Sequence, residues 1–236
     1  MALIEVRGLT KTYGFAPALR KLDLTVERGE CVALLGANGS GKSTLIRCLC
    51  ALSKPTAGTI TIGGWSLPRE AAAVRAQIGL VAHKPLIYDG LTARENLAFF
   101  ARLYGVASAR IDIVLEQVGL TKRADDPART YSRGMMQRLS IARAILHEPE
   151  VLLLDEPYTG LDADSSAALD ALLRTMHADG GTILMALHDF ERAARMASRV
   201  AILARGQIAY DSATSGAFPR DPAALSAIYA QMSVRA

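Results

Sequence analysis

The chain has 236 residues, of which 50% are hydrophobic and 21% are charged. These proportions exclude a disordered chain, because they supply enough apolar surface for one sizeable core or for a core with a small lobe attached. The formal net charge of +4 is scattered along the sequence. Its densest basic set, Arg192, Arg195 and Arg199, lies on a predicted helix without interleaved aromatic residues, and we interpret it as a solvated face. No nucleic-acid partner is therefore expected.

The cysteines and the hydropathy of the chain indicate the cellular compartment in which the protein works. The three cysteines, Cys31, Cys48 and Cys50, lie in apolar segments and are predicted to be buried rather than paired in disulfides. We expect a reduced, cytosolic compartment on that basis. No leader-like segment is seen, and no apolar run approaches the ~20 residues that cross a bilayer, so any work at a membrane is expected to pass through a partner.

The first segments of the chain predict a small antiparallel sheet. Residues 3–6 and 22–26 alternate apolar and polar side chains, and residues 59–62, bounded by glycines, form a third strand of the same kind. Tyr13 is placed on the loop between the first two strands. Its ring there either stacks on a base or packs beneath the loop, and the residues alone favour packing.

A glycine-rich loop between a strand and a helix follows. Residues 32–35 are an apolar run typical of a strand buried on both faces of a parallel sheet, and residues 45–52 have a helical spacing. Between them, Gly36-x-x-x-x-Gly41-Lys42-Ser43 is a phosphate-binding P-loop. The alternative, a glycine-rich turn before an ordinary helix, fits the strand-to-helix setting less well.

The P-loop residues have separate predicted tasks. The glycines let successive backbone N–H groups surround an anion at the positive end of the helix. Lys42 is expected to reach the β- and γ-phosphates of a nucleotide, and the hydroxyl of Ser43 to bind Mg²⁺.

Residues 84–148 are predicted to be a mostly helical insertion. Thr92 and Glu95 form a capping box before one amphipathic helix, and Gly119 ends a second. The β/α alternation then resumes, which predicts an α/β fold with a mainly parallel sheet. The expected strands are 151–154, 182–187 and 200–203, and the expected helices are 163–176, 189–196 and a tail helix at 223–232 to which we assign no chemistry.

Two of these strands end in residues that carry chemistry. Asp155 and Glu156 follow an apolar strand, so they are expected at the carboxyl edge of the sheet, where doubly wound folds bind ligands. Asp155 is predicted to hold Mg²⁺, and Glu156 to polarise the attacking water. His188 follows another strand at the same edge, where it can bond a terminal phosphate. The alternatives are two surface acids and a helix-capping histidine.

The whole chain resembles an ABC-transporter nucleotide-binding domain, with its motifs in order. GANGSGKST matches the P-loop, LLLDEP at 152–157 (with Val151 ahead of it) the Walker B motif, Gly160-Leu161-Asp162 the D-loop, YSRGMMQR the signature motif and His188 the switch histidine. The resemblance implies a P-loop NTPase (RecA-like) core with a small antiparallel β-subdomain and a helical subdomain. It implies one domain, with a core at about 1–83 and 149–215, a helical subdomain at about 84–148 and a tail at about 216–236.

The resemblance also implies a set of ligand-binding residues. Tyr13 matches the aromatic residue that stacks on adenine, which reverses the preference for packing. Ser132 and Gly134 are expected to contact the γ-phosphate bound to the opposite subunit of a head-to-tail dimer. The implied ATP-binding set is Tyr13, Gly36, Ala37, Asn38, Gly39, Ser40, Gly41, Lys42, Ser43, Thr44, His83, Ser132, Gly134 and Asp162, with Glu156 and His188 catalytic and Ser43 and Asp155 on Mg²⁺.

Two residues depart from the family pattern. Arg133 replaces the first signature glycine and adds a charge near the expected dimer seam. His83 stands where most members carry a glutamine whose oxygen touches magnesium. Because magnesium prefers oxygen ligands, the hinge role is carried over to His83 but the metal contact is not.

The expected function is that of the ATPase subunit of a transporter, with ATP and Mg²⁺ as cofactors. It would act as a dimer with a second copy or a homologous ATPase, peripheral on the cytoplasmic face of the membrane, beside an integral permease. Residues 81–105 are similar to those of the haem-exporter ATPases of cytochrome c maturation, and the groove at 84–91 is expected to receive a permease helix. The alternative is a soluble ABC ATPase of the iron-sulfur assembly, translation-factor or DNA-repair type.

Overall fold

The structure, a computed structural model, describes residues 2–215 and 218–235. Its centre is a six-stranded sheet in the order β10-β9-β3-β8-β7-β6. Neighbouring strands from β6 to β9 run parallel, and β10 pairs antiparallel with β9 at one edge. The strands are β3 (Cys31–Leu35), β6 (Ile78–Val81), β7 (Val151–Asp155), β8 (Thr182–Leu187), β9 (Arg199–Ala204) and β10 (Gln207–Asp211).

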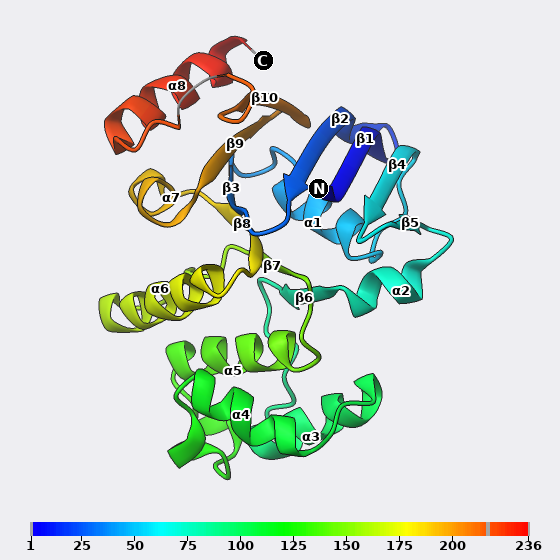
Figure 1. The fold of residues 1–236 in the computed structure, drawn as a ribbon. Coiled ribbons are helices and arrows are strands. Elements are labelled where there is room, and N and C mark those ends of the chain that lie inside the picture. Colours follow the sequence, from blue (N-terminus) through cyan, green and yellow to red (C-terminus); the bar gives the residue numbers. More distant parts are fainter. Residues whose placement is uncertain (1, 216–217, 236) are drawn as a thin grey trace.

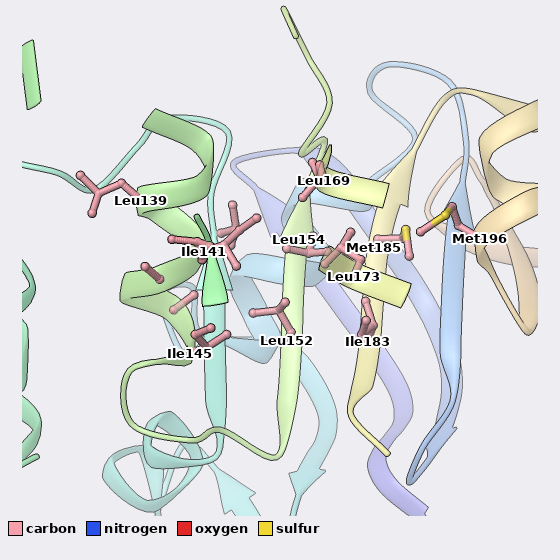
Figure 2. Close-up of a cluster of buried hydrophobic side chains, with 14 of the residues drawn as sticks. Leu139, Ile141, Ile145, Leu152, Leu154, Leu169, Leu173, Ile183, Met185 and Met196 are labelled. Atoms are coloured by element: carbon pink, nitrogen blue, oxygen red, sulfur yellow. The ribbon is translucent and has the colours of Figure 1, made fainter. Parts of the chain in front are cut away.

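Both faces of this sheet are apolar. Every residue of β3, β7, β8 and β9 is buried, as expected for parallel strands covered on two sides. Successive residues of β3 alternate between two hydrophobic clusters, with Ala33 and Leu35 in one and Val32 and Leu34 in the other. Figure 2 shows part of the first cluster, in which Leu152, Leu154, Ile183 and Met185 of the sheet lie beside Leu169 and Leu173. The predicted α/β fold class is confirmed.

A second, four-stranded antiparallel sheet has the order β2-β1-β4-β5. Its strands are β1 (Ala2–Tyr13), β2 (Ala16–Glu27), β4 (Ala57–Ile62) and β5 (Trp65–Leu67). The sequence pattern predicted three of these strands, β1, β2 and β4, but the predicted β1 and β2 were far too short. Register shifts along the β1–β2 pair break the alternation of apolar and polar residues, so the pattern is legible only in places. Tyr13 is the last residue of β1, paired with Ala16, so its predicted place on a loop is wrong.

The insertion between β6 and β7 is helical, with α3 (Ala93–Tyr104), α4 (Ala109–Gln117) and α5 (Arg133–Ile145) gathered beyond one edge of the large sheet (Figure 1). The capping box is confirmed. The Oγ1 of Thr92 accepts a 3.1 Å hydrogen bond from the N–H of Glu95, whose Oε2 accepts a 2.8 Å bond from the N–H of Thr92. Gly119 adopts φ +65° just after α4, as expected of a residue that stops a helix.

The remaining helices cover the large sheet or lie at its ends. They are α1 (Lys42–Leu49), α2 (Ala71–Ala76), α6 (Ala163–Ala178), α7 (Phe190–Met196) and α8 (Pro222–Arg235). In Figure 1, α8 lies beside α7 at the end of the molecule away from α3, α4 and α5. No helix among residues 2–215 and 218–235 has the length and apolar character needed to span a bilayer.

The basic set at 192–199 is not a solvated helix face, so that interpretation is wrong. Arg199 opens β9, is 8% exposed and pairs with Glu30 and Asp211. Arg192 and Arg195 do lie on α7, but both reach the buried carboxylate of Asp170. The sequence hid these pairs because each carboxylate comes from a distant segment of the chain.

The three cysteines are buried and free, as predicted. Burial raises the pKa of Cys31 and of Cys50 to about 12 and also raises the pKa of Cys48. All three thiols are therefore protonated at neutral pH.

Candidate functional site

The loop between β3 and α1 has a shape that only glycine permits. A Cβ on Gly36 would lie 2.5 Å from the carbonyl oxygen of Leu203, and one on Gly41 would lie 2.7 Å from that of Ala18. Gly39 and Gly41 have φ of +80° and +114°. The backbone is thus held close to its neighbours while it turns into the N-terminus of α1, the arrangement that presents N–H groups to an anion.

Lys42, the first residue of α1, is buried beneath this loop with 4% of its surface exposed. Its Nζ donates hydrogen bonds to the carbonyl oxygens of Gly36, at 2.8 Å, and Ala37, at 3.2 Å. The Oε1 of Glu156 lies 3.8 Å from the same Nζ. A desolvated positive charge therefore sits between the loop and Glu156. The Oγ of Ser40, also in the loop, is buried without a hydrogen-bond partner.

The two predicted magnesium ligands are in direct contact. The Oγ of Ser43 donates a 3.0 Å hydrogen bond to Oδ1 of Asp155, although 112 residues separate them. Burial raises the pKa of Asp155 above its usual value, and the Ser43 bond opposes that rise. Among the described residues no group of three or more His, Cys, Asp or Glu side chains could hold a metal. A hydroxyl and a carboxylate nevertheless fit Mg²⁺, which takes part of its shell from phosphates and water.

Glu156 and His188 line one pocket with the P-loop. The pocket has a volume of about 360 Å³, and the residues around it are Leu35, Gly36, Ala37, Asn38, Glu156, Thr159, His188, Phe190 and Tyr229. The backbone of Glu156 has φ +52°, a left-handed conformation that strains a residue with a Cβ. Its N–H donates to the carbonyl oxygen of Ala186 on the neighbouring strand, which helps to hold that conformation.

Tyr229, on α8, is a wall of this pocket that the sequence did not indicate. Its ring meets that of Phe190 edge to face, with the centroids 5.1 Å apart. We assigned no chemistry to this tail helix from the sequence, and that interpretation did not include its contact with the pocket. A single aromatic residue on the tail helix gives no signal in the sequence that could have placed it here.

His83 lies apart from that pocket. It follows β6, is exposed, and lines a separate cavity of about 270 Å³ that Arg133, Gln137 and Glu156 also border. The two departures from the family pattern thus face the same space on the far side of Glu156. The predicted hinge role of His83 remains a prediction.

Ser132, Gly134 and Asp162 do not line the P-loop pocket of their own chain. Ser132 caps α5 by accepting a hydrogen bond from the N–H of Met135, and Asp162 caps α6 by accepting one from the N–H of Ser165. Gly134 is buried so tightly against α6 that an added Cβ would lie 2.1 Å from Oγ of Ser165. The predicted contact of these residues with a nucleotide bound to a second chain remains a prediction.

Tyr13 lies exposed at the end of β1. Its hydroxyl is 3.4 Å from the Oγ of Ser53, and the ammonium of Lys11 lies 4.8 Å from the centre of its ring. The predicted stacking on adenine remains a prediction, as does the contact of Thr44 with the nucleotide.

The chain is similar to ATP-binding proteins of transporters. The family model described as ABC transporter matches residues 19–159. The chain is 38% identical to an uncharacterized ABC transporter ATP-binding protein of Bacillus subtilis (91% of this chain, 70% of the relative). It is 40% identical to a daunorubicin resistance ATP-binding protein of Streptomyces coeruleorubidus (87% and 66%) and 36% identical to a Nod factor export ATP-binding protein of Cupriavidus pinatubonensis (87% and 65%). The chain thus spans about two thirds of the length of these relatives.

Solved structures agree with the sequence matches. An ATP-binding subunit of an ABC transporter aligns with a TM-score of 0.86 and 30% identity, covering 98% of this chain and 99% of the other. A dimeric ATP-binding cassette in a post-hydrolysis state, bound to ADP and Pi, aligns with a TM-score of 0.80 and 29% identity, covering 88% and 97%. The chain therefore belongs to the ABC transporter family and is an ATP-binding cassette ATPase.

Proposed function

We propose that this protein is the ATP-hydrolysing subunit of an exporter and works beneath a separate integral membrane permease, peripheral on the cytoplasmic face. The names of two relatives, one of Nod factor export and one of daunorubicin resistance, support export. The observation that carries the catalytic part is the 360 Å³ pocket, because it brings the P-loop, Glu156 and His188 together.

The proposed site residues, those that line this pocket together with Lys42, Ser43 and Asp155 beside it, divide the work of phosphoryl transfer. The P-loop amides and Lys42 bind the β- and γ-phosphates, and Ser43 and Asp155 hold Mg²⁺. When bound, the metal neutralises charge on the phosphate oxygens. Glu156 accepts a hydrogen bond from the attacking water and draws its proton away, while His188 donates to the terminal phosphate. The strained backbone at Glu156 keeps its carboxylate turned toward Lys42.

The proposal includes a head-to-tail dimer, formed with a second copy or with a homologous ATPase. Ser132 and Gly134 lie at the N-terminus of α5, which has positive potential, and they are outside their own chain's pocket. Closing over the γ-phosphate of a second chain would use that potential. The dimeric post-hydrolysis cassette with 29% identity supports the formation of a dimer.

The permease is proposed to dock on the loop that follows β6. Leu86 and Tyr88 in this loop are 47% and 51% exposed, and Phe99 of α3 beside them is 44% exposed. The rings of Tyr88 and Phe99 meet edge to face at 5.2 Å. Asn96, fully buried, accepts a hydrogen bond from the N–H of Tyr88 and donates one to its carbonyl oxygen, so the loop presents a fixed surface.

Purification from membranes tests the docking proposal. A tagged wild-type chain should recover an integral membrane protein in detergent, whereas Tyr88→Ala should lose it without changing the ATPase rate of the isolated chain. Trp65→Ala, on the small sheet and similarly exposed at 43%, is the control and should retain the partner. Recovery of a soluble complex that does not depend on lipid would instead support a soluble ABC ATPase.

The transported molecule is a finer proposal. Haem export rests on the resemblance of residues 81–105 to the haem-exporter ATPases alone. Stimulation of ATP hydrolysis by haem in the reconstituted complex would support it. Stimulation by an amphipathic drug and not by haem would exclude it.

A further inference from the structure

A buried cluster joins the two strand ends that carry Glu156 and His188. We name it the Tyr158 brace, and it consists of Tyr158, Asp170 and Arg192. Tyr158 follows Glu156 by two residues, Arg192 follows His188 by four, and Asp170 lies between them on α6. Three segments of the chain thus meet directly behind the two proposed catalytic side chains.

The members of the brace are in close contact. The guanidinium carbon of Arg192 lies 3.7 Å from the centre of the Tyr158 ring, which is stacking distance for a cation over an aromatic face. The Nε of Arg192 is 3.8 Å from Oδ1 of Asp170. The other carboxylate oxygen of Asp170 accepts a 2.7 Å hydrogen bond from Arg195.

The brace is desolvated. Asp170 is 6% exposed, and the side chain of Arg192 is 15% exposed. Oδ1 of Asp170 and Nε of Arg192 are buried without a hydrogen-bond partner, and the hydroxyl of Tyr158 is buried beside the carboxylate of Asp170. Burial and the adjacent carboxylate of Asp170 raise the pKa of Tyr158, so its hydroxyl remains a proton donor throughout the physiological range.

Such a cluster is costly as a means of stabilising the fold. Packed apolar side chains of the same volume are often as stable as a buried ion pair, or more stable, whereas buried charges fix one geometry. The backbone of Arg192 is also held in place, because its N–H donates a 3.0 Å hydrogen bond to the carboxylate of Asp189. Arg192 is therefore held at both its backbone and its side chain, one turn after His188.

Two residues of the brace and both proposed catalytic residues line one cavity of about 320 Å³. Tyr158 and Arg192 line it together with Glu156 and His188. We therefore expect a change in the brace to affect both proposed catalytic residues more than the P-loop, which lines a different pocket.

We propose that Tyr158, Asp170 and Arg192 are positioning residues for ATP hydrolysis, because they fix the separation of Glu156 and His188. The proposal rests on the roles assigned above to those two residues. A displacement of about 1 Å at a catalytic group can cost up to ~100-fold in rate, so a loosened brace should slow turnover. It should leave nucleotide binding unchanged, because Lys42 and the P-loop glycines are held by other contacts.

Steady-state kinetics of the full chain test this. Tyr158→Phe removes only the hydroxyl and should lower kcat by ~10-fold, with KM for ATP within ~2-fold of wild type. Tyr158→Leu, which also removes the face under Arg192, should lower kcat further. Arg102→Gln, at an exposed position on α3 away from the brace, is the control and should not change kcat.

A double-variant comparison separates positioning from general destabilisation. If the brace acts as a unit, Tyr158→Phe combined with Asp170→Asn should be no slower than the slower single variant, because removing one member already releases the others. Unchanged kcat in both Tyr158 variants, or a parallel rise in KM, would overturn the proposal. Glu156→Gln is measured alongside, since its failure to slow turnover would reject the assignment of the base independently of the brace.

Discussion

The P-loop region and the Tyr158 brace are two solutions to the problem of holding groups around one nucleotide. The P-loop takes its parts from one uninterrupted stretch, in which β3, the glycine turn and α1 follow each other directly. The brace takes one residue from each of three segments that span positions 158–192. In the first, geometry comes from backbone that excludes a Cβ, and in the second it comes from buried side chains.

This difference indicates a division of labour. Backbone amides and a buried lysine suit the ground-state binding of phosphate, because they form an anion site before any reaction begins. The brace instead shares a cavity with Glu156 and His188, the residues proposed to act on the water and on the terminal phosphate, and the P-loop does not line that cavity. Binding and turnover should therefore respond separately to changes in the two regions.

The largest expected effect is on turnover. Glu156→Gln removes the carboxylate that polarises the attacking water but keeps the size and position of the side chain, so kcat should fall by ~10² or more. Affinity for ATP, measured by equilibrium binding of a fluorescent analogue, should stay intact or increase slightly because a negative charge near the phosphates is lost. Near-normal hydrolysis would show that the two regions do not divide the work as described.

The next effect is on binding. Gly36→Ala places a methyl group 2.5 Å from the carbonyl oxygen of Leu203, so the loop must shift. Overpacking of this kind costs about 1–3 kcal/mol, which corresponds to ~5-fold to ~150-fold in affinity if the strain falls on the bound conformation. Gly90→Ala, with open space around it, is the control. If Gly36→Ala lowered kcat and left the affinity for ATP unchanged, the assignment of binding to the P-loop and of turnover to the brace would be wrong.

The smallest effect concerns Asp155, which stands where the two regions meet. The pKa of Asp155 in the folded chain is above the usual 3.8, so the unfolded chain releases this proton at a lower pH than the folded chain does. The free energy of unfolding therefore falls as the pH rises from the unfolded pKa to the folded pKa. The loss is complete above the folded pKa and therefore present at pH 7. Asp155→Asn, measured by thermal unfolding without nucleotide or magnesium, should be more stable than wild type at pH 7.

The pH dependence supplies the check on Asp155. Below pH 3.8 both states of the wild-type chain carry the proton, so the advantage of Asp155→Asn should disappear there. An asparagine variant that was less stable at both pH values would show that the Ser43 hydrogen bond outweighs desolvation.

The parts of the site that the sequence predicted are those whose residues are neighbours along the chain. Continuous apolar runs predicted β3, β7 and β8, and the residues just past them were correctly placed at one edge of the sheet. Thr92 and Glu95 predicted the start of α3 because a capping box is complete within four residues. The family resemblance supplied the rest of the proposed site.

What the sequence did not predict depends on partners far away. Arg199 pairs with Glu30 across 169 positions, and nothing near either residue distinguishes such a pair from two solvated charges. Tyr229 reaches the pocket only because α8 folds back onto α7. The strands β5 and β10 were missed because they are short and partly polar, and their pairing partners, not their own pattern, define them. The helix α2 was missed because six residues are too few to show a helical period.

The burial of all three cysteines has a practical consequence for measuring how two copies of the chain approach each other during ATP hydrolysis. A thiol attacks maleimides and disulfides as its thiolate, and the raised pKa values leave essentially none of that form at neutral pH. A single cysteine introduced on the surface would therefore be the one rapidly labelled site in an otherwise unaltered chain. Spin labels or fluorophores could then follow the approach of two copies without a cysteine-free background that would leave voids around β3 and α1.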